Sequence, residues 1–205
     1  MTADLREVRA DFDATTIVVY QAYAPAIADA ALTAGKFVAP FSFTRMTWIK
    51  PSLLWLMHRS SWARKPGQER VLAVRIRRDA WDAALARGVL TSPERGAHDS
   101  SRAWAEAFGT ADVHVQWDPE RSLRGAPLNH YSIQVGVGRA LVAAYADEWT
   151  VELTDLTSVV HKAASLVRSG RHEQARRLLP TERPYPLDAA VARRLGVGLS
   201  RPGRR

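Results

Sequence analysis

Cysteine is absent from this chain of 205 residues, and so are long apolar runs. Without cysteine there is no disulfide, no thiolate zinc site, no iron–sulfur cluster and no cysteine nucleophile. No apolar stretch approaches the ~18 residues that a membrane-spanning helix needs. The N-terminal residues MTADLREVRADFD are charged and lack the apolar segment of a signal peptide. We therefore expect a cytoplasmic protein with no membrane partner.

Metal-binding and phosphate-binding motifs are also missing. No two of the six histidines have the i,i+4 spacing of helical metal ligands, and HExxH does not occur, so we expect no metal site. Gly136 and Gly138 lie between an expected strand and an expected helix, where a phosphate could bind. The third glycine and the P-loop lysine are lacking, so a tight turn is the simpler interpretation.

Positive charge is unevenly distributed along the chain, which carries a net charge of +8. Residues 168–205 contain ten arginines against three acidic residues, and residues 59–78 contain seven basic residues against one, Glu69. Such blocks are typical of nucleic-acid contacts. Arginine bias from a GC-rich genome explains the C-terminal block equally well, and both explanations stay open.

The pattern of apolar residues predicts about six extended segments alternating with helices. The expected strands or extended segments are 15–23, 39–50, 70–77, 112–118, 130–138 and 149–156. The expected helices are 25–37, 51–62, 79–88, 139–148, 156–179 and 185–196. Several strand-to-strand links are loops without a helix, which favours an α+β fold. We predict a single domain with a mixed, mainly antiparallel sheet flanked by helices.

The charge balance changes near residue 168 and indicates a boundary there. We predict an α+β core domain over residues 1–167. Residues 168–205 would form an Arg-rich helical extension with a disordered end.

The stretch TRMTWIKPSLLWLMHRSSW, residues 44–62, is the strongest candidate for a site. In an extended segment, Met46, Trp48 and Lys50 share one face, and Arg45 flanks them on the other. An aromatic ring beside cations can stack a base and bind its phosphate. The apolar run around Trp55 predicts a buried helix.

Two further groups are candidates on position alone. Alternation places His114, Gln116 and Asp118 on one face of the expected strand 112–118, where they either gather into a site or face solvent. Glu152 is the only glutamate on an expected internal strand, and it is a candidate general base. Lys50 is a candidate catalytic lysine, which would require a pKa lowered by burial or by a neighbouring cation.

The segments VVYQAY, RMTWIKPS, VQWDPER and SIQVGV resemble a bacterial and fungal family known as domain of unknown function 4291. The resemblance covers about residues 5–160, and RMTWIKPS is its most specific block. It implies the extent of the domain and no particular activity.

The order of elements is also similar to the NAD-binding half of the ADP-ribosyltransferase superfamily. This resemblance implies NAD as cofactor, and it assigns roles to individual residues. Tyr20 or Tyr23 would stack on nicotinamide, Ser42, Thr44, Arg45 and Trp48 would line the nucleotide, Arg59 or Arg75 would hold pyrophosphate, and Gln134 or Glu152 would stabilise an oxocarbenium-like ribose. The leading hypothesis is a nucleotide-directed transferase acting on a nucleotide or nucleic acid.

Two alternatives come from other classes. A non-catalytic RNA- or DNA-binding module would use the basic residues 59–78 and the Arg-rich tail with Trp48 and Trp62, and its affinity would fall steeply with salt. A small-molecule enzyme of unknown chemistry would use Arg45, Lys50 and the face formed by Gln116 and Asp118. The sequence leaves the oligomeric state open.

Overall fold

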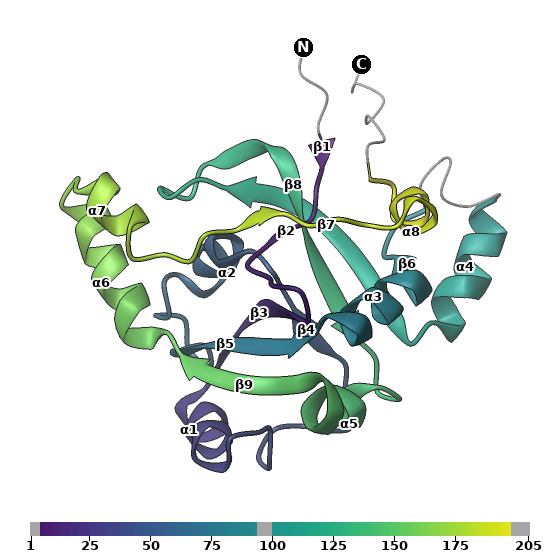
Figure 1. Ribbon diagram of the computed structural model, residues 1–205, viewed down its shortest axis with the longest axis horizontal. Coiled ribbons are helices and arrows are strands. Elements are labelled where there is room, and N and C mark those ends of the chain that lie inside the picture. Colours follow the sequence, from purple (N-terminus) through teal and green to yellow (C-terminus); the bar gives the residue numbers. More distant parts are fainter. Residues whose placement is uncertain (1–4, 94–99, 198–205) are drawn as a thin grey trace.

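The computed structural model describes residues 5–93 and 100–197, and Figure 1 shows two main β-sheets with helices around them. The strands are β1 (Leu5–Arg6), β2 (Arg9–Ala10), β3 (Thr16–Tyr23), β4 (Thr47–Ile49), β5 (Arg70–Arg77), β6 (Val89–Leu90), β7 (Val113–Arg121), β8 (Pro127–Val137), β9 (Thr150–Asp155) and β10 (Arg183–Pro184). The helices are α1 (Pro25–Ala34), α2 (Leu53–Ser60), α3 (Arg78–Arg87), α4 (Ser101–Thr110), α5 (Val142–Ala144), the π-helical turn η1 (Tyr145–Trp149), α6 (Thr157–Arg168), α7 (His172–Arg176) and α8 (Ala189–Arg194).

The larger sheet is organised around β8. This strand pairs antiparallel with β7 and β4 and parallel with β1, while β6 pairs parallel with β7. The β7–β8 register places Gln116 opposite Gln134. On the other side of β8, Trp48 of β4 lies opposite Gly136. The register therefore brings residues from three separate parts of the sequence to one region of the sheet.

The smaller sheet contains β3, β5 and β9, and all of its pairings are antiparallel. β3 and β5 pair along their whole length, from Thr16 opposite Arg77 to Tyr23 opposite Arg70. A bridge between Tyr20 and Lys50 joins β3 to the residue that follows β4. This bridge connects the two sheets at the position of a predicted site residue.

Apolar side chains from both sheets form one buried core. Leu72, Val74 and Ile76 point into it from β5, as the alternation of that strand predicts. Val115 of β7 and the fully buried Trp81 of α3 belong to the same cluster. In Figure 1, α6 and α7 lie on one side of the molecule, and α3, α4 and α8 lie on the opposite side.

Both ends of α2 are fixed by hydrogen bonds. The Trp55 N–H donates to the Ser52 hydroxyl (3.2 Å), and the Leu53 N–H donates to the Glu182 carboxyl group (2.8 Å). At the other end, residues 61–63 adopt left-handed backbone with φ of 53°, 57° and 60°. The Trp62 N–H donates back to the Met57 carbonyl (2.9 Å). The side chains on the outer face of α2 are therefore presented from a firmly held helix.

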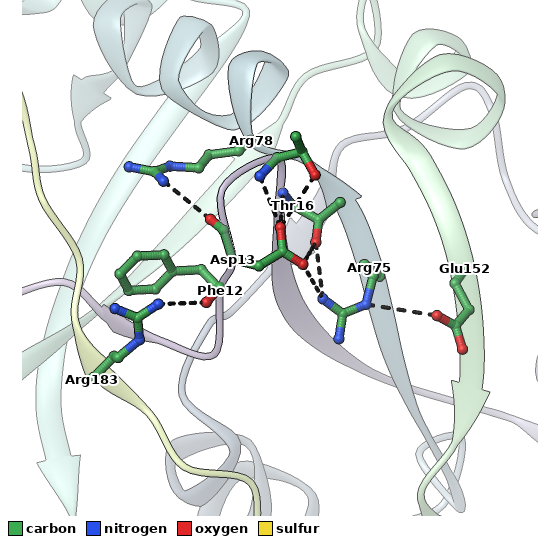
Figure 2. Close-up of polar contacts among 8 residues, drawn as sticks. Phe12, Asp13, Thr16, Arg75, Arg78, Glu152 and Arg183 are labelled. Carbon is green, nitrogen blue, oxygen red and sulfur yellow. Dashed lines mark hydrogen bonds and ion pairs between the residues drawn. The ribbon is translucent and has the colours of Figure 1, made fainter.

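The chain beyond residue 168 packs back onto the N-terminal strands. β10 pairs antiparallel with β2, and Tyr185 and Leu195 are buried in the main core. The Arg183 guanidinium lies 3.7 Å from the centre of the Phe12 ring and donates to the Phe12 carbonyl (2.7 Å), as Figure 2 shows. Residues 168–197 therefore share the core of the preceding chain.

The α+β class with a mixed, mainly antiparallel sheet is confirmed. The ADP-ribosyltransferase-like arrangement is not supported, because β3 and β5 pair in one sheet whereas β4 pairs with β8 in the other. Residues 39–50 were expected to be extended throughout, but only Thr47–Ile49 form a strand. Among the described residues, no helix is long and apolar enough to cross a membrane. The disordered end expected after α8 lies outside the described residues.

Candidate functional site

A cavity of about 780 Å³ opens where β4 and α2 approach β7 and β8. We refer to this cavity as the cleft, and its volume is in the range of small-molecule sites, ~300–1,000 Å³. Its lining includes Tyr23, Arg45, Trp48, Lys50, Trp55, His58, Arg59, Gln116, Asp118, Arg121 and Gln134. The structure thus brings together seven residues of the predicted nucleotide site, namely Tyr23, Ser42, Arg45, Trp48, Lys50, Arg59 and Gln134, together with the candidates Gln116 and Asp118.

Lys50 lies at the inner wall of the cleft. Lys50 is 8% exposed. Its Nζ atom lies 3.4 Å from the Trp48 carbonyl oxygen and 5.3 Å from the centre of the Trp55 ring. Among the described residues, no carboxylate oxygen comes within 4 Å of this amine. Burial and then the nearby Arg59 lower the pKa of Lys50 to about 8, while Asp118 opposes them. The lowered pKa that a catalytic lysine requires is therefore present.

A buried hydrogen-bond network holds the strand that carries Lys50. Gln21 of β3 donates to the Thr47 hydroxyl (2.8 Å) and to the Trp48 carbonyl (3.1 Å), and it accepts from the Tyr145 hydroxyl (2.6 Å). The Tyr23 hydroxyl lies 3.2 Å from the Thr47 hydroxyl, and burial raises the pKa of Tyr23. This network fixes the backbone on both sides of Trp48 and so sets the position of the cleft wall.

Asp118 forms the acidic centre of the opposite wall. The Gln116 side-chain amide donates to one carboxylate oxygen (2.9 Å), and the Gln134 amide donates to the other (2.9 Å). The pairing of β7 with β8 places the two glutamines opposite each other, so this arrangement follows from the register. His114 does not share it, because its ring packs edge-on against Phe108 at 4.5 Å and its Nε2 lies 3.3 Å from the Phe108 carbonyl oxygen.

Cations outnumber acids in the lining of the cleft. Arg45, Arg59 and Arg121 join Lys50 there, against the single carboxylate of Asp118. The Nε atom of Arg121 is buried and has no hydrogen-bond partner among the described residues. Burial, followed by Arg121 and Arg59, lowers the pKa of His58. The cleft therefore carries a positive field suited to an anionic ligand.

Two tryptophans contribute aromatic surface at the same place. Trp48 comes from β4 and is partly exposed, whereas Trp55 comes from α2 and is 8% exposed. Tyr23 also lines the cleft, but its ring packs edge-on against Phe37 and Phe41 at about 6 Å. Trp48, rather than the tyrosine expected to stack on nicotinamide, offers an accessible aromatic ring, whereas the Trp55 ring lies under the Lys50 amine.

Tyr20 and Thr44 lie outside the cleft. Tyr20 is fully buried in a second cluster with Leu53, Leu56 and Val71, so it is a core residue and not a ligand-stacking residue. Thr44 is exposed, and its hydroxyl lies 3.3 Å from that of Ser42, which does line the cleft.

Arg75 and Glu152 lie on the smaller sheet, away from the cleft. Figure 2 shows Arg75 donating to the Thr16 hydroxyl (2.9 Å) and facing Asp13 (3.3 Å) and Glu152 (3.7 Å). The Glu152 side chain is 61% exposed. The predicted roles in pyrophosphate binding and catalysis are therefore not supported, because the two residues form a surface ion pair between neighbouring strands β5 and β9.

Gly136 and Gly138 have packing roles. A Cβ atom at Gly136 would lie 2.6 Å from the Met46 sulfur and 3.1 Å from the Trp48 ring. At Gly138 it would lie 2.5 Å from the Asp112 carbonyl oxygen. Gly136 lies inside β8 rather than in a tight turn, and it makes room for a tryptophan of the cleft, whereas Gly138 allows close approach of the Asp112 backbone.

Sequence reasoning missed several cleft residues. Trp55 was expected to be core only, although Trp55, His58 and Arg59 have the i, i+3, i+4 spacing of one helix face. Gln21 and Arg121 carry no local signal, because their roles depend on contacts with distant segments. Among the described residues, no group of three or more His, Asp or Glu side chains is placed to hold a metal ion.

Comparison with protein families identifies one match, over residues 7–185, to the family described as Domain of unknown function (DUF4291). The chain belongs to this family. The DUF4291 match covers all elements that line the cleft and extends past the expected end near residue 160 to β10 and Tyr185. The chain matches no curated protein.

Proposed function

We propose that the cleft binds a nucleotide and that the protein is a nucleotide-directed transferase in which Lys50 is the nucleophile. The observation that carries this proposal is the buried amine of Lys50, which faces a cleft lined by three arginines. With its pKa lowered to about 8, a substantial fraction of this amine is neutral near pH 7.5. A neutral amine is the reactive form of lysine.

The remaining lining of the cleft supports a nucleotide as the ligand. Arg45, Arg59 and Arg121 can bind phosphate oxygens through their guanidinium groups. The partly exposed ring of Trp48 can stack a base. A volume of about 780 Å³ accommodates one nucleotide together with its phosphates. NAD and ATP both meet these requirements.

In the step that this arrangement supports, the Lys50 Nζ bonds to a phosphorus atom of the bound nucleotide. The bond between that phosphorus and the leaving phosphate oxygen breaks, and Lys50 releases one proton to solvent. The arginines stabilise the negative charge that develops on the phosphate oxygens. Attack by an acceptor on the same phosphorus then frees Lys50 and completes the transfer.

Ligand binding is tested by thermal shift with NAD, ATP, GTP and pyrophosphate. A nucleotide at a concentration 100 times its Kd stabilises the folded state by about 2.7 kcal/mol, which is readily seen as a rise in Tm. Arg59→Ala should reduce this rise. The matched control Arg139→Ala changes an exposed arginine that does not line the cleft and should leave the rise unchanged.

The role of Lys50 is tested by incubation with the nucleotide that binds, followed by quenching in alkaline denaturant, because a bond between nitrogen and phosphorus is hydrolysed in acid, and by peptide mass spectrometry at neutral or alkaline pH. We expect a nucleotidyl group on the peptide that contains Lys50. The adduct should be lost in Lys50→Met and retained in Lys162→Met, which changes an exposed lysine on α6. Binding without any adduct would refute the nucleophile. Trapping of a carbonyl ligand on Lys50 by borohydride would instead establish Schiff-base chemistry.

A further inference from the structure

A second hollow, of about 590 Å³, lies between the tip of the β7–β8 hairpin and α7. It is lined by Arg124 from the hairpin and by Arg171 and Arg176 from the chain around α7. Glu173 is the only acidic residue in its lining, and it pairs with Arg176 (2.9 Å). We refer to it as the α7 hollow. Like the cleft, it is strongly cationic.

The hairpin connects the cleft to the α7 hollow. Arg121 lines the cleft, and the next three residues, 122–124, line the α7 hollow. A third cavity of about 390 Å³ includes Arg121 and Arg176 and therefore borders both, and its lining also contains Arg9 and the acidic residues Glu120 and Glu182. Gly125 lies against His58 of α2, since a Cβ atom there would be 3.7 Å from the His58 ring. Figure 1 shows the hairpin extending toward α7.

Three of the arginines along this route are available to an external anion, whereas Arg176 pairs with Glu173 (2.9 Å). Arg121, Arg124 and Arg171 make no ion pair with any described carboxylate. Arg121 contacts the Gly125 carbonyl only at 3.4 Å, and the Arg171 Nε donates to the Ser169 hydroxyl (3.1 Å). We call Arg121, Arg124, Arg171 and Arg176 the cationic path. To contact all of these arginines, a ligand must carry several negative charges in succession. A single nucleotide bound in the cleft does not extend along the path.

The chemistry of the path favours a nucleic acid over other polyanions. Its cations are all arginines, whose planar forks match phosphate oxygens. Aromatic faces occur at one end, in the cleft, where an unpaired terminal base can stack. A lipid surface is disfavoured, because the only strongly exposed large apolar residues in the described chain, Leu128 and Val151, are isolated from each other on β8 and β9.

We infer that the substrate of the transferase is a single-stranded nucleic acid, with one end in the cleft and its backbone bound along the cationic path. This inference rests on the proposed function, since the cleft must accept a nucleotide. An unpaired strand is required because a base that stacks on Trp48 inside the cleft cannot remain paired. The path then holds the phosphates that follow the terminal nucleotide.

The test is fluorescence anisotropy with labelled 12-nucleotide single-stranded RNA and DNA, a 12-base-pair duplex, and an oligoglutamate of equal charge as competitor. The Arg124→Ala/Arg171→Ala double variant should bind a single strand at least tenfold more weakly at low salt. The slope of log K against log salt should fall by about 1.4, because each lost phosphate contact contributes about 0.7. The control Arg193→Ala/Arg194→Ala removes two exposed arginines from α8, on the opposite side of the molecule, and should bind normally.

Mononucleotide binding, measured by thermal shift, separates the two proposals. The inference is supported if the double variant loses affinity for single strands but keeps the nucleotide-induced rise in Tm. It is overturned, with the proposed function intact, if nucleotides bind and single strands do not, or if both double variants weaken strand binding equally. Stronger binding of the duplex, or equal competition by oligoglutamate, also overturns it. Absence of binding by nucleotides and strands alike refutes both proposals.

Discussion

Glu182 provides a sharp test of the physical reasoning, because its carboxyl group is partly buried at the start of α2. It accepts the Leu53 N–H (2.8 Å). Burial raises its pKa from 4.5 to about 8, and the nearby Glu120 adds to the rise, while Arg9 and the Leu53 hydrogen bond oppose it. Below pH 8 the folded protein therefore holds a proton that the unfolded chain releases above about pH 4.5. Glu182→Gln keeps a hydrogen-bond acceptor for Leu53 and removes the ionisation.

The expected effect follows from proton linkage. The pKa of Glu182 is higher in the folded protein than in the unfolded chain. Below pH 4.5 the carboxyl group is protonated in both states and does not lower the free energy of unfolding. As pH rises from 4.5 to about 8, the unfolded chain loses this proton first, so the free energy of unfolding falls. Each pKa unit corresponds to about 1.36 kcal/mol. The Glu182→Gln variant should therefore gain stability over the native protein by about 1 kcal/mol at pH 5 and about 3 kcal/mol at pH 7, with a ceiling of about 5 kcal/mol above pH 9.

Urea denaturation followed by tryptophan fluorescence at pH 5, 7 and 9 measures these differences. The matched control is Glu173→Gln, which changes an exposed glutamate on α7 and should give a difference within about 0.5 kcal/mol at every pH. A Glu182→Gln variant that is less stable than the native protein, or a difference that does not grow with pH, would refute the reasoning. Either result would mean that the carboxylate is ionised and well solvated in the folded state.

Four further substitutions test other parts of the structure by urea denaturation, with nucleotide binding followed by thermal shift. Lys50→Met should raise the free energy of unfolding by up to about 3 kcal/mol at pH 7, because the pKa of Lys50 is lowered from 10.5 to about 8 in the folded protein. The gain should vanish above pH 10.5, where the lysine is neutral in both the folded and the unfolded state. Gly138→Ala should lose about 2 kcal/mol or more against the Asp112 backbone, whereas Gly136→Ala, which meets only side chains, should lose less but weaken nucleotide binding. Trp81→Ala should cost about 3–5 kcal/mol, since the side chain is fully buried.

The local sequence pattern was sufficient to predict those strands and helices in which apolar residues recur at a clear interval. The β-branched runs predict strands at 15–23 and 70–77, and the structure has β3 and β5 at Thr16–Tyr23 and Arg70–Arg77. The expected helix over 139–148 is instead a short α-helix followed by the π-helical turn η1. Residues 39–46 do not join a strand, because the aromatic rings of Phe41 and Phe43 pack against each other and lead this segment over the core.

The candidate site could be predicted only in part, for a related reason. Trp48 and Lys50 were found because alternation alone places them together beside Arg45. Tyr20 was expected to stack on a ligand, but it is buried in the core. Both faces of β3 are covered, and the alternation of residues along a strand does not show which part of the protein covers each face. The pairing of Gln116 and Gln134 around Asp118 depends on the register of two strands, which no local pattern encodes.

The pairing of β2 with β10 has a consequence for the synthesis of the chain. Arg9 donates to the Glu182 carbonyl across 173 residues of sequence. At about 5–20 residues per second, the ribosome needs roughly 9–35 s to deliver this partner after β2 has emerged. Val8 and Phe12 lack a partner during that interval, since the Tyr185 N–H donates to the Val8 carbonyl and the Tyr185 ring packs edge-on against Phe12. Folding of this part of the core is therefore expected to finish only after translation has passed residue 185.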